Sequence, residues 1–476
     1  MSDYNASPDI AQIVQRVVQR LSENSGQASS AATPKPSGHR RGIFSSVEEA
    51  MKATKVAQEK FCKTSLATRK DMVAAMREVS KQEAQRLAEL TVQETKMGRV
   101  DDKVKKNLLV AEKTPGVELL PCGAEMGDNG LTVEEYSPFG IILSVSPTTN
   151  PNATVINNSI SMISAGNSVF FAPHPRALQT TLETIHILNG AIERAGGPAN
   201  LIVATDSASI EHTKGLMRHP DISLICATGG PALVNEALSA GKRAIGAAAG
   251  NPPALVDDTA DAERAAREII LGHSFDNNLP CTSEKEVIMT SGIADALMRA
   301  FRNAPNTYMV EPSLLPKLEA LVLNENRNGP NPKCVGQDPC VILRELGIDV
   351  GQDIRAIIAE VDADHPFIHN ELLMPVLGVT RVRDFKDAVR LAVEAEHGLR
   401  HSAIIHSSNI YNMSEFNHAI NATLFIKNAP SYAGLGYGAE GHTSFTIAGR
   451  TGEGMTNTRT FVRSRRCILV GAFSAV

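Results

Sequence analysis

The sequence has no tryptophan, few aromatic residues and no excess of charge of either sign. Aromatic residues make up 4% of the 476 residues, and 47 Lys and Arg against 52 Asp and Glu give a formal net charge of −5. Proteins that hold nucleic acid or an anionic membrane surface rely on a basic field, and single-strand binders add stacked aromatic side chains. The composition therefore predicts neither a nucleic-acid partner nor a membrane partner.

Long apolar runs and a disulfide framework are also missing. Runs such as 140–145 and 168–172 are far shorter than the roughly 18 residues of a membrane span, and the first residues lack the basic and apolar regions of a secretory signal. The cysteines are odd in number and scattered, at positions 62, 122, 226, 281, 334, 340 and 467. With hydrophobic residues at 42%, we expect a soluble cytoplasmic protein in a reducing compartment.

Two cysteines and two histidines could suggest a metal site, but their spacing argues against one. Cys334 and Cys340 are too far apart for a zinc module. Pro366 interrupts a helical pairing of His365 with His369. The sequence predicts no metal centre.

The first 22 residues predict an amphipathic helix, and residues 23–41 predict a flexible linker rich in Ser, Ala, Pro and Gly. Within residues 7–21, Ser7 can cap the helix, and apolar residues recur at helical spacing, namely Ile10, Ile13, Val14, Val17, Val18 and Leu21. Two interpretations stay open. The helix either folds back on its own or a sister subunit, or it docks on another protein. Because its polar face carries only two arginines, a membrane-surface helix is disfavoured.

The remaining chain predicts two α/β lobes. Residues 47–112 are helix-rich, and short strand-like runs separated by turns follow up to residue 145. Apolar strand candidates then alternate with helical stretches over 150–256 and again over 253–427, the pattern of parallel sheets built from βαβ units. Between one such strand and the next helix, Gly229 and Gly230 would allow close approach of an anionic ligand.

Four segments together carry a family resemblance. They are SPFGIILSVSPTTNP (137–151), ICATGGPALV (225–234), FDNNLPCTSEK (275–285) and HPFIHNELLMPVLGVTRV (365–382). In this set and order, the chain resembles the aldehyde dehydrogenase superfamily, and within it the CoA-acylating enzymes of bacterial microcompartments. The N-terminal helix and linker resemble the encapsulation peptide of these enzymes, which implies a shell-protein partner for residues 7–21 and a place in the microcompartment lumen.

The resemblance implies a division of the chain. An NAD-binding domain would span 42–252, a catalytic domain 253–430, and a C-terminal return and oligomerisation segment 431–476. A β-arm drawn from the region near 117–136 and the last residues would build a homodimer or homotetramer.

The resemblance also assigns catalytic residues. Cys281 matches the nucleophile, and the chemistry needs a sulfur that attacks a carbonyl and later leaves as a thiolate. Asn150 matches the asparagine that, with the backbone N–H of Cys281, stabilises the oxyanion. An Asx turn before Pro151 is the purely structural interpretation of Asn150, and the two roles can hold at once.

The expected cofactor is NAD. By the resemblance, Ser146, Pro147 and Thr148 pass the nicotinamide end, Gly229 and Gly230 lie at the pyrophosphate, and Glu371 bonds the nicotinamide ribose. The residue-by-residue reading alone would make Glu371 a solvated surface acid. Hydrolytic relatives have a lysine where this chain has Ala172. The sequence therefore does not distinguish a preference for NAD from one for NADP.

A second departure bears on the reaction. Hydrolytic relatives carry a glutamate where this chain has Ala247, and alanine cannot act as a general base toward water. The acyl thioester should therefore persist until CoA arrives, giving acyl-CoA from a short-chain aldehyde of two or three carbons. A hydrolytic or phosphorylating relative and a catalytically silent cargo adaptor are the alternatives.

Overall fold

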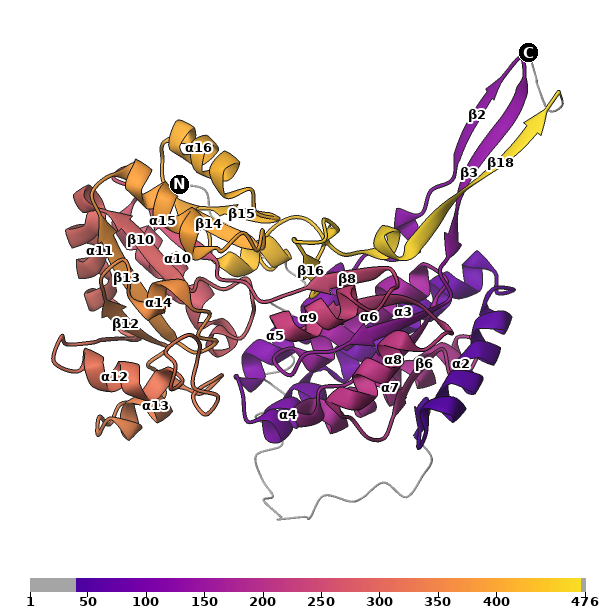
Figure 1. Cartoon of the computed structure of the whole chain (residues 1–476), viewed down its shortest axis with the longest axis horizontal. Helices are drawn as coiled ribbons and strands as arrows, with labels where there is room; N and C mark the ends of the chain where they lie inside the picture. The colour runs from indigo at the N-terminus through magenta and orange to yellow at the C-terminus, as the bar shows by residue number, and fades with distance from the viewer. Residues whose placement is uncertain (1–39, 472–476) are drawn as a thin grey trace. The chain divides into compact units, whose positions relative to one another are not determined.

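The computed structural model describes residues 40–471, so the helix predicted over 7–21 and most of the predicted linker lie outside the described residues. The described chain forms two lobes, each built on a parallel sheet, and a three-stranded antiparallel sheet (Figure 1). This arrangement confirms the predicted α/β class with two parallel-sheet lobes.

The first lobe contains a six-stranded sheet in the order β1-β6-β5-β4-β7-β8, with every neighbouring pair parallel. Its strands are β1 (Ile43–Phe44), β4 (Ile141–Val145), β5 (Ser168–Ala172), β6 (Ile202–Thr205), β7 (Ile222–Thr228) and β8 (Ala244–Ala247). Because β5 and β6 lie on one side of β4 while β7 and β8 lie on the other, the direction of winding reverses beside β4. Open sheets of this kind bind ligands at the carboxyl ends of the strands next to the reversal.

Helices cover both faces of the first sheet because alternate strand residues point to opposite sides. On β4, Ile142 enters a core shared with α3, α5, α6 and α7, whereas Leu143 enters a core shared with α8 and α9. The helices of this lobe are α2 (Val47–Phe61), α3 (Leu66–Gln82), α4 (Ala84–Thr95), α5 (Val100–Lys113), α6 (Pro151–Ser164), α7 (Leu178–Arg194), α8 (Ile210–Arg218) and α9 (Pro231–Leu238).

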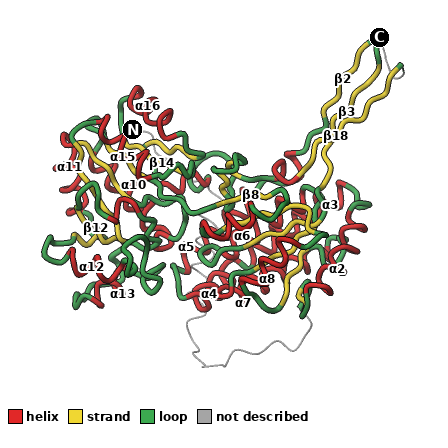
Figure 2. The backbone as a smooth tube through the Cα atoms, in the orientation of Figure 1, coloured by secondary structure: helices red, strands yellow, loops and turns green. Residues whose placement is uncertain are grey.

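The second lobe contains a seven-stranded parallel sheet in the order β11-β12-β13-β10-β9-β14-β15. Its strands are β9 (Pro253–Val256), β10 (Glu286–Thr290), β11 (Thr307–Met309), β12 (Ala356–Glu360), β13 (Val376–Val382), β14 (Ser402–His406) and β15 (Leu424–Lys427). Its helices are α10 (Ala262–Ser274), α11 (Ser291–Asn303), α12 (Leu315–Val322), α13 (Pro339–Glu345), α14 (Pro366–His369), α15 (Phe385–Ala395) and α16 (Ile410–Ile420). Here too the apolar cores divide between the two faces of the sheet. Figure 2 marks the helices in red and the strands in yellow.

The antiparallel sheet joins segments that are far apart in sequence. Strand β3 (Gly130–Pro138) pairs with β2 (Gly123–Gly127) on one side and with β18 (Val462–Val470) on the other. Most of its side chains are exposed, including the apolar Met126, Ile468 and Val470. A short ladder of β16 (Ile447–Ala448) and β17 (Gly454–Met455) precedes β18.

A membrane crossing needs a helix with a long, nearly uncharged apolar stretch. None of the helices between residues 40 and 471 meets that requirement.

Candidate active site

A cavity of about 730 Å³ lies at the carboxyl ends of the strands that flank the reversal of the first sheet. Residues 145–150 after β4 and 228–233 after β7 form one part of its wall. The second lobe closes it with residues that come before its own strands: Cys281 precedes β10 and Glu371 precedes β13. The carboxyl edge of one sheet therefore faces the amino edge of the other across the cavity.

Every residue predicted from the sequence to serve the site lies in the wall of this one cavity. They are Cys281, Asn150, Ser146, Pro147, Thr148, Gly229, Gly230 and Glu371. The segments that carry them are separated by up to 225 residues, from Ser146 to Glu371, and come together only through the fold.

Asn150 lies where the loop after β4 enters α6. Pro151 occupies the first helical position, and the carbonyl of Asn150 accepts the first helical hydrogen bond, from Thr154 N at 3.0 Å. The side chain makes no capping bond. Its Oδ1 instead accepts from Lys106 Nζ at 2.5 Å, and its Nδ2 donates to Thr149 Oγ1 at 3.1 Å. The Asx-turn interpretation is therefore wrong, because the amide faces a lysine and the cavity rather than the helix N–H groups.

The loop before Cys281 has an unusual backbone. Asp276, Asn277 and Asn278 lie in the left-handed region, with φ of 49°, 53° and 63°. Aspartate and asparagine tolerate this region better than other side chains that carry a Cβ. All three are buried, and protein groups hold them: Asn277 Nδ2 donates to Gly336 O at 3.0 Å and Asn278 Nδ2 to His273 O at 2.9 Å. The loop therefore presents Cys281 from a fixed backbone.

The Cys281 side chain is partly exposed in this wall. Burial raises the pKa of its thiol to about 12; the nearby Glu371 carboxylate adds to the rise, while Lys285 and Lys106 oppose it. The resting group is a protonated thiol at neutral pH. The thiolate that the chemistry needs must therefore form during the reaction.

Glu371 is not the solvated acid that its local sequence suggests. Its side chain is 14% exposed, and its Oε1 lies 3.8 Å from Nζ of the fully buried Lys285. Burial raises the pKa of Glu371 and lowers the pKa of Lys285. Lys285 Nζ also donates to Asn278 O at 2.8 Å and Oδ1 at 2.7 Å, so it links Glu371 to the loop of the nucleophile.

The wall formed by the end of β8 contains no acid. Ala247 lines the cavity together with its neighbours 248 and 249. The acidic side chains in the cavity wall are Glu236, which pairs with Arg218, and Glu371. The position expected to carry a water-activating glutamate in hydrolytic enzymes thus presents only a methyl group.

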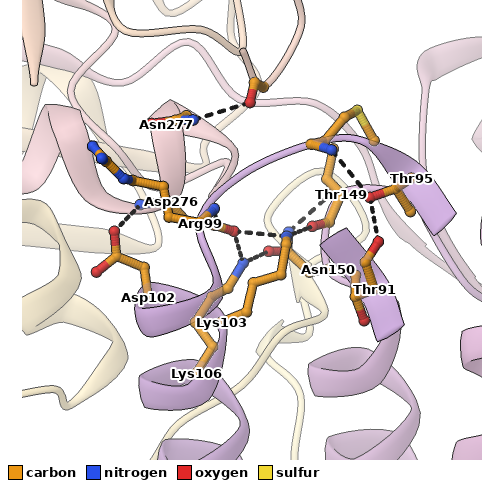
Figure 3. A network of polar contacts seen from close by, with 12 residues as sticks. Thr91, Thr95, Arg99, Asp102, Lys103, Lys106, Thr149, Asn150, Asp276 and Asn277 are labelled. Atoms are coloured by element: carbon orange, nitrogen blue, oxygen red, sulfur yellow. Dashed lines mark hydrogen bonds and ion pairs between the residues drawn. The ribbon is translucent and has the colours of Figure 1, made fainter. Parts of the chain in front are cut away.

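A buried charged cluster lies directly behind Asn150 (Figure 3). Lys103 and Lys106 come from α5 and converge on Oδ2 of Asp276; Lys103 lies 3.0 Å from it, and Lys106 also pairs with it. The side chains of the two lysines are 4% and 2% exposed, and that of Asp276 is fully buried. Lys103 also donates to the carbonyl of Thr149 at 3.3 Å. This cluster joins the two lobes at the site.

The sequence interpretation missed Lys103, Lys106, Asp276 and Lys285 as site residues. In the stretch VDDKVKKNLLVAEK, the lysines alternate with acids and apolar residues as they would on a solvated helix face. Nothing local indicates that a carboxylate about 170 residues further along will cover them.

His401 is another neighbour of the nucleophile that the sequence did not indicate. A Cβ built on Gly250 would lie 2.8 Å from both His401 Cγ and the Cys281 carbonyl oxygen, so glycine allows these groups to pack closely. The His401 Nδ1 lies 2.7 Å from Ser402 Oγ, and burial lowers the pKa of the ring to about 4. The histidine is neutral at physiological pH.

Within the range 40–471, no group of three or more His, Cys, Asp or Glu side chains is arranged to hold a metal ion. His365 serves as the N-cap of α14, accepting from Phe367 N, and His369 ends the same short helix.

Comparisons with known proteins agree on one group. The aldehyde dehydrogenase family model matches residues 40–328. The acetaldehyde dehydrogenase (acetylating) EutE of Escherichia coli (strain K12) is 45% identical over 476 residues, which cover 98% of this chain and 99% of the relative.

Three solved structures have the same fold. The propionaldehyde dehydrogenase of Rhodopseudomonas palustris, with bound CoA and an acylated cysteine, is 45% identical with a TM-score of 0.89, covering 91% of this chain and 99% of that one. A propionaldehyde dehydrogenase from the Clostridium phytofermentans fucose utilisation bacterial microcompartment is 45% identical with a TM-score of 0.89, covering 92% and 100%. An engineered glycolyl-CoA reductase with bound NADP+ is 44% identical with a TM-score of 0.89, covering 91% and 99%.

Proposed function

Since the chain belongs to the aldehyde dehydrogenase family, we propose that its cavity oxidises a short-chain aldehyde in two half-reactions that meet at Cys281. The enzyme is a CoA-acylating aldehyde dehydrogenase that uses a nicotinamide dinucleotide and CoA. The net reaction converts aldehyde, NAD+ and CoA to acyl-CoA, NADH and a proton. The observation that carries this proposal is one cavity that holds a thiol and an amide but presents only a methyl group at Ala247.

The walls of the cavity fit a nicotinamide dinucleotide. The hydroxyls of Ser146 and Thr148 are buried and have no hydrogen-bond partner within the described part of the chain, so a polar ligand would satisfy them. A Cβ on Gly230 would meet no atom within 4 Å. Together with Gly229, it leaves room for a pyrophosphate at the start of α9, where the positive end of the helix dipole favours an anion. We propose that the carboxylate of Glu371 accepts hydrogen bonds from the ribose hydroxyls.

The first half-reaction makes a carbon–sulfur bond. Cys281 Sγ attacks the aldehyde carbon as the thiol releases its proton to water, and the carbonyl oxygen becomes an oxyanion. This is the proton released in the net reaction. We propose that the side-chain N–H of Asn150 and the backbone N–H of Cys281 donate hydrogen bonds to this oxygen. Collapse of the thiohemiacetal expels hydride from the same carbon and leaves a thioester on Sγ. When bound, the nicotinamide ring accepts this hydride.

The second half-reaction transfers the acyl group to CoA. The thiolate of CoA attacks the thioester carbon, and Cys281 Sγ leaves as the new thioester forms. Water competes poorly at this stage because Ala247 offers no general base. CoA is a strong nucleophile and exchanges one thioester for another, so acyl-CoA rather than free acid is the product.

A product assay with and without CoA tests the proposal. Purified enzyme is supplied with NAD+ and either acetaldehyde or propionaldehyde, and acyl-CoA, free acid and NADH are quantified. We expect NADH and acyl-CoA in equal amounts, and a halt after about one turnover per site when CoA is omitted. Sustained turnover to free acid without CoA would identify a hydrolytic enzyme instead.

The covalent intermediate gives a second test. Enzyme incubated with aldehyde and NAD+ but no CoA is digested at low pH, and the peptide covering 275–285 is analysed by mass spectrometry. An acyl mass on Cys281 that disappears when CoA is added supports the proposed course. An unmodified peptide during active turnover contradicts it.

The substrate is proposed to be an aldehyde of two or three carbons. Steady-state comparison of acetaldehyde, propionaldehyde and butyraldehyde, each with NAD+ and NADP+, would rank chain length and nucleotide by kcat/KM. A preference for butyraldehyde over both shorter aldehydes would overturn this assignment.

We also propose that residues 7–21 dock the enzyme to a microcompartment shell protein and place it in the lumen. The support is the apolar helical pattern of that segment and its family resemblance. Residues 1–22 fused to a fluorescent protein should collect on shells in cells that make them. Diffuse fluorescence in the presence of intact shells would refute this role.

The antiparallel sheet is proposed to build a homodimer or homotetramer. Its strands β2, β3 and β18 expose apolar side chains such as Ile468 and Val470, at 59% and 79%, which a second copy would cover. Light scattering on the intact enzyme, compared with the Ile468→Asp variant, tests this. A mass equal to one chain in the unaltered enzyme would contradict the proposal.

A further inference from the structure

Lys106 makes a contact that the proposed chemistry has not yet used. Its Nζ lies 2.5 Å from Oδ1 of Asn150, and the lysine side chain is 2% exposed. The same Nζ pairs with Oδ2 of Asp276, which belongs to the loop that carries Cys281. A single ammonium group is thus bound to the amide on one side of the reacting centre and to the nucleophile's own loop on the other (Figure 3).

The contact decides which way the amide of Asn150 points. An ammonium group has only donors, so its partner must be the amide oxygen. With Oδ1 held by Lys106, Nδ2 is turned away; one of its N–H groups serves Thr149 Oγ1 at 3.1 Å, and the other is left for the cavity that Asn150 lines. If the amide rotated by half a turn, N–H groups would face the ammonium and an oxygen would face the developing oxyanion.

We infer that Lys106 is a positioning residue that locks the Asn150 amide with its N–H toward the oxyanion, and that Asp276 anchors this lysine to the nucleophile loop. The inference rests on the proposed function, since it needs an oxyanion at this place. A bond from a charged donor is strong enough to hold one amide orientation, and an oxyanion donor is effective only when it is aimed before the charge develops.

Asp276 is suited to the anchoring role. Its second oxygen, Oδ1, accepts the backbone N–H of Arg99 at 2.8 Å, and Lys103 shares Oδ2 at 3.0 Å. A buried lysine needs such a partner because transfer of an unpaired charge from water costs several kcal/mol. Burial nevertheless lowers the pKa of Lys106 to about 8, although Asp276 works in the opposite direction.

A rival explanation is that Lys106 acts through its charge on the thiolate of Cys281. The two roles differ in what they need. A positioning role requires the amide of Asn150, whereas a charge role works without the amide and accounts for the whole loss of rate through the titration of the thiol.

A double-mutant cycle separates the two roles. Lys106→Met, Asn150→Ala and the double variant are compared with the wild type by single-turnover NADH formation at saturating aldehyde and NAD+. Lys103→Met is the matched control, because it removes a lysine of similar burial from the same carboxylate without touching the Asn150 side chain. Thermal unfolding checks that each variant is folded, and the pH dependence of iodoacetamide alkylation reports the Cys281 thiol.

We expect Lys106→Met to slow single-turnover NADH formation about 100-fold, close to the loss in Asn150→Ala. The double variant should be within about twofold of Asn150→Ala alone, since residues that act through one another are not additive. The loss of single-turnover rate in Lys103→Met should be at least about fivefold smaller than the loss in Lys106→Met. The alkylation midpoint should rise by less than about 0.5 pH units in Lys106→Met, because Lys106 contributes least among the groups that act on the pKa of the thiol.

The positioning role would be overturned if the losses of the single variants multiplied in the double variant, or if Lys103→Met lost as much as Lys106→Met. A rise of the alkylation midpoint by about two pH units in Lys106→Met would also overturn it, because charge alone would then explain a 100-fold loss. If the wild type itself formed no NADH from aldehyde, the proposed function would fail and this inference with it. If the wild type is active but the losses of the two single variants multiply in the double variant, the inference is rejected and the proposed function stands.

Discussion

The two sides of the cavity are built by opposite means. The nucleophile wall, defined as residues 275–285 with Asn150 and Lys106, is crowded with buried polar and charged groups that bond to one another. The small-residue wall, defined as Gly229, Gly230 and residues 247–249, presents backbone and methyl groups. The comparison separates the two tasks of the site.

The nucleophile wall must fix reacting atoms, since a misplacement of about 1 Å can cost about 100-fold in rate. It does so with left-handed backbone and buried ions, both of which cost stability. In the proposed mechanism the small-residue wall admits two bulky ligands in turn, for which space matters more than fixed contacts. Substitutions in the first wall should therefore change rate, and substitutions in the second should change what is bound or released.

Among substitutions in the nucleophile wall, Cys281→Ser should cause the largest loss of activity. The serine hydroxyl is a far weaker nucleophile, and an ester would be a poor acyl donor to CoA, so we expect kcat to fall by at least about 10⁴-fold. NADH formation under saturating substrates measures the loss. Cys226→Ser, in a buried strand of the first lobe, is the matched control and should keep most of the activity. Comparable losses in both variants would remove Cys281 from its role.

Asn150→Ala comes next. Loss of one oxyanion donor should lower kcat about 100- to 1000-fold, with little change in the KM for aldehyde. Asn150→Asp keeps the shape but places a negative charge at the oxyanion, so it should be at least as slow. A fall of less than about threefold in both variants would show that the amide does not act in the reaction.

Ala247→Glu tests the small-residue wall, and its effect is on product rather than rate. The new carboxylate would line the cavity and could activate water against the thioester, so the ratio of free acid to acyl-CoA should rise about tenfold at limiting CoA. Ala247→Gln has nearly the same size but no base, and should leave the ratio unchanged. Equal ratios in the two variants would mean that geometry, not the missing base, protects the thioester.

The smallest effect concerns acid stability. Burial lowers the pKa of His273 and of His401 to about 4, below the 6.5 of an exposed histidine. As pH falls from 6.5 toward 4, the two rings gain protons in the unfolded state but not in the folded state, so they lower stability over this window. The buried Glu284 acts in the opposite direction, because burial raises its pKa to about 7. His273 Nδ1 lies 2.7 Å from Glu284 O, and His401 packs beside Gly250, near the Cys281 carbonyl oxygen.

Hydrogen exchange at pH 7 and pH 5 measures this local effect. Peptides covering 398–408 contain His401 and His406, and burial lowers the pKa of both rings to about 4. These peptides should lose protection at pH 5 more than peptides covering 222–234, where the small-residue wall begins. Equal loss in both regions would show that the buried histidines do not weaken their own region selectively.

The fold was largely predictable from the sequence because its strands are short apolar runs with helices between them. The stretches SVFFA and ISLIC became the buried strands β5 and β7, and Gly229 with Gly230 connects β7 to α9. Cys281, Asn150 and Glu371 could be placed through motifs that lie in contiguous sequence. The roles given to these residues stay predictions that the variants above address.

The buried cluster behind Asn150 could not be predicted, for a physical reason. Lys103 and Lys106 belong to a helix whose local pattern indicates a solvated face, and their burial depends on Asp276 from the other lobe. The raised pKa of the Cys281 thiol likewise comes from the walls around it rather than from its neighbours in sequence. Such properties arise only when distant segments meet.

The left-handed run at Asp276, Asn277 and Asn278 has a consequence for how this protein tolerates change. A β-branched residue at any of these positions would add about 1–3 kcal/mol of backbone strain, which lowers the yield of folded enzyme before turnover is measured. The tripeptide thus filters variants by yield of folded enzyme, while changes at Gly229 or Ala247 reach the soluble pool and can be screened for new products.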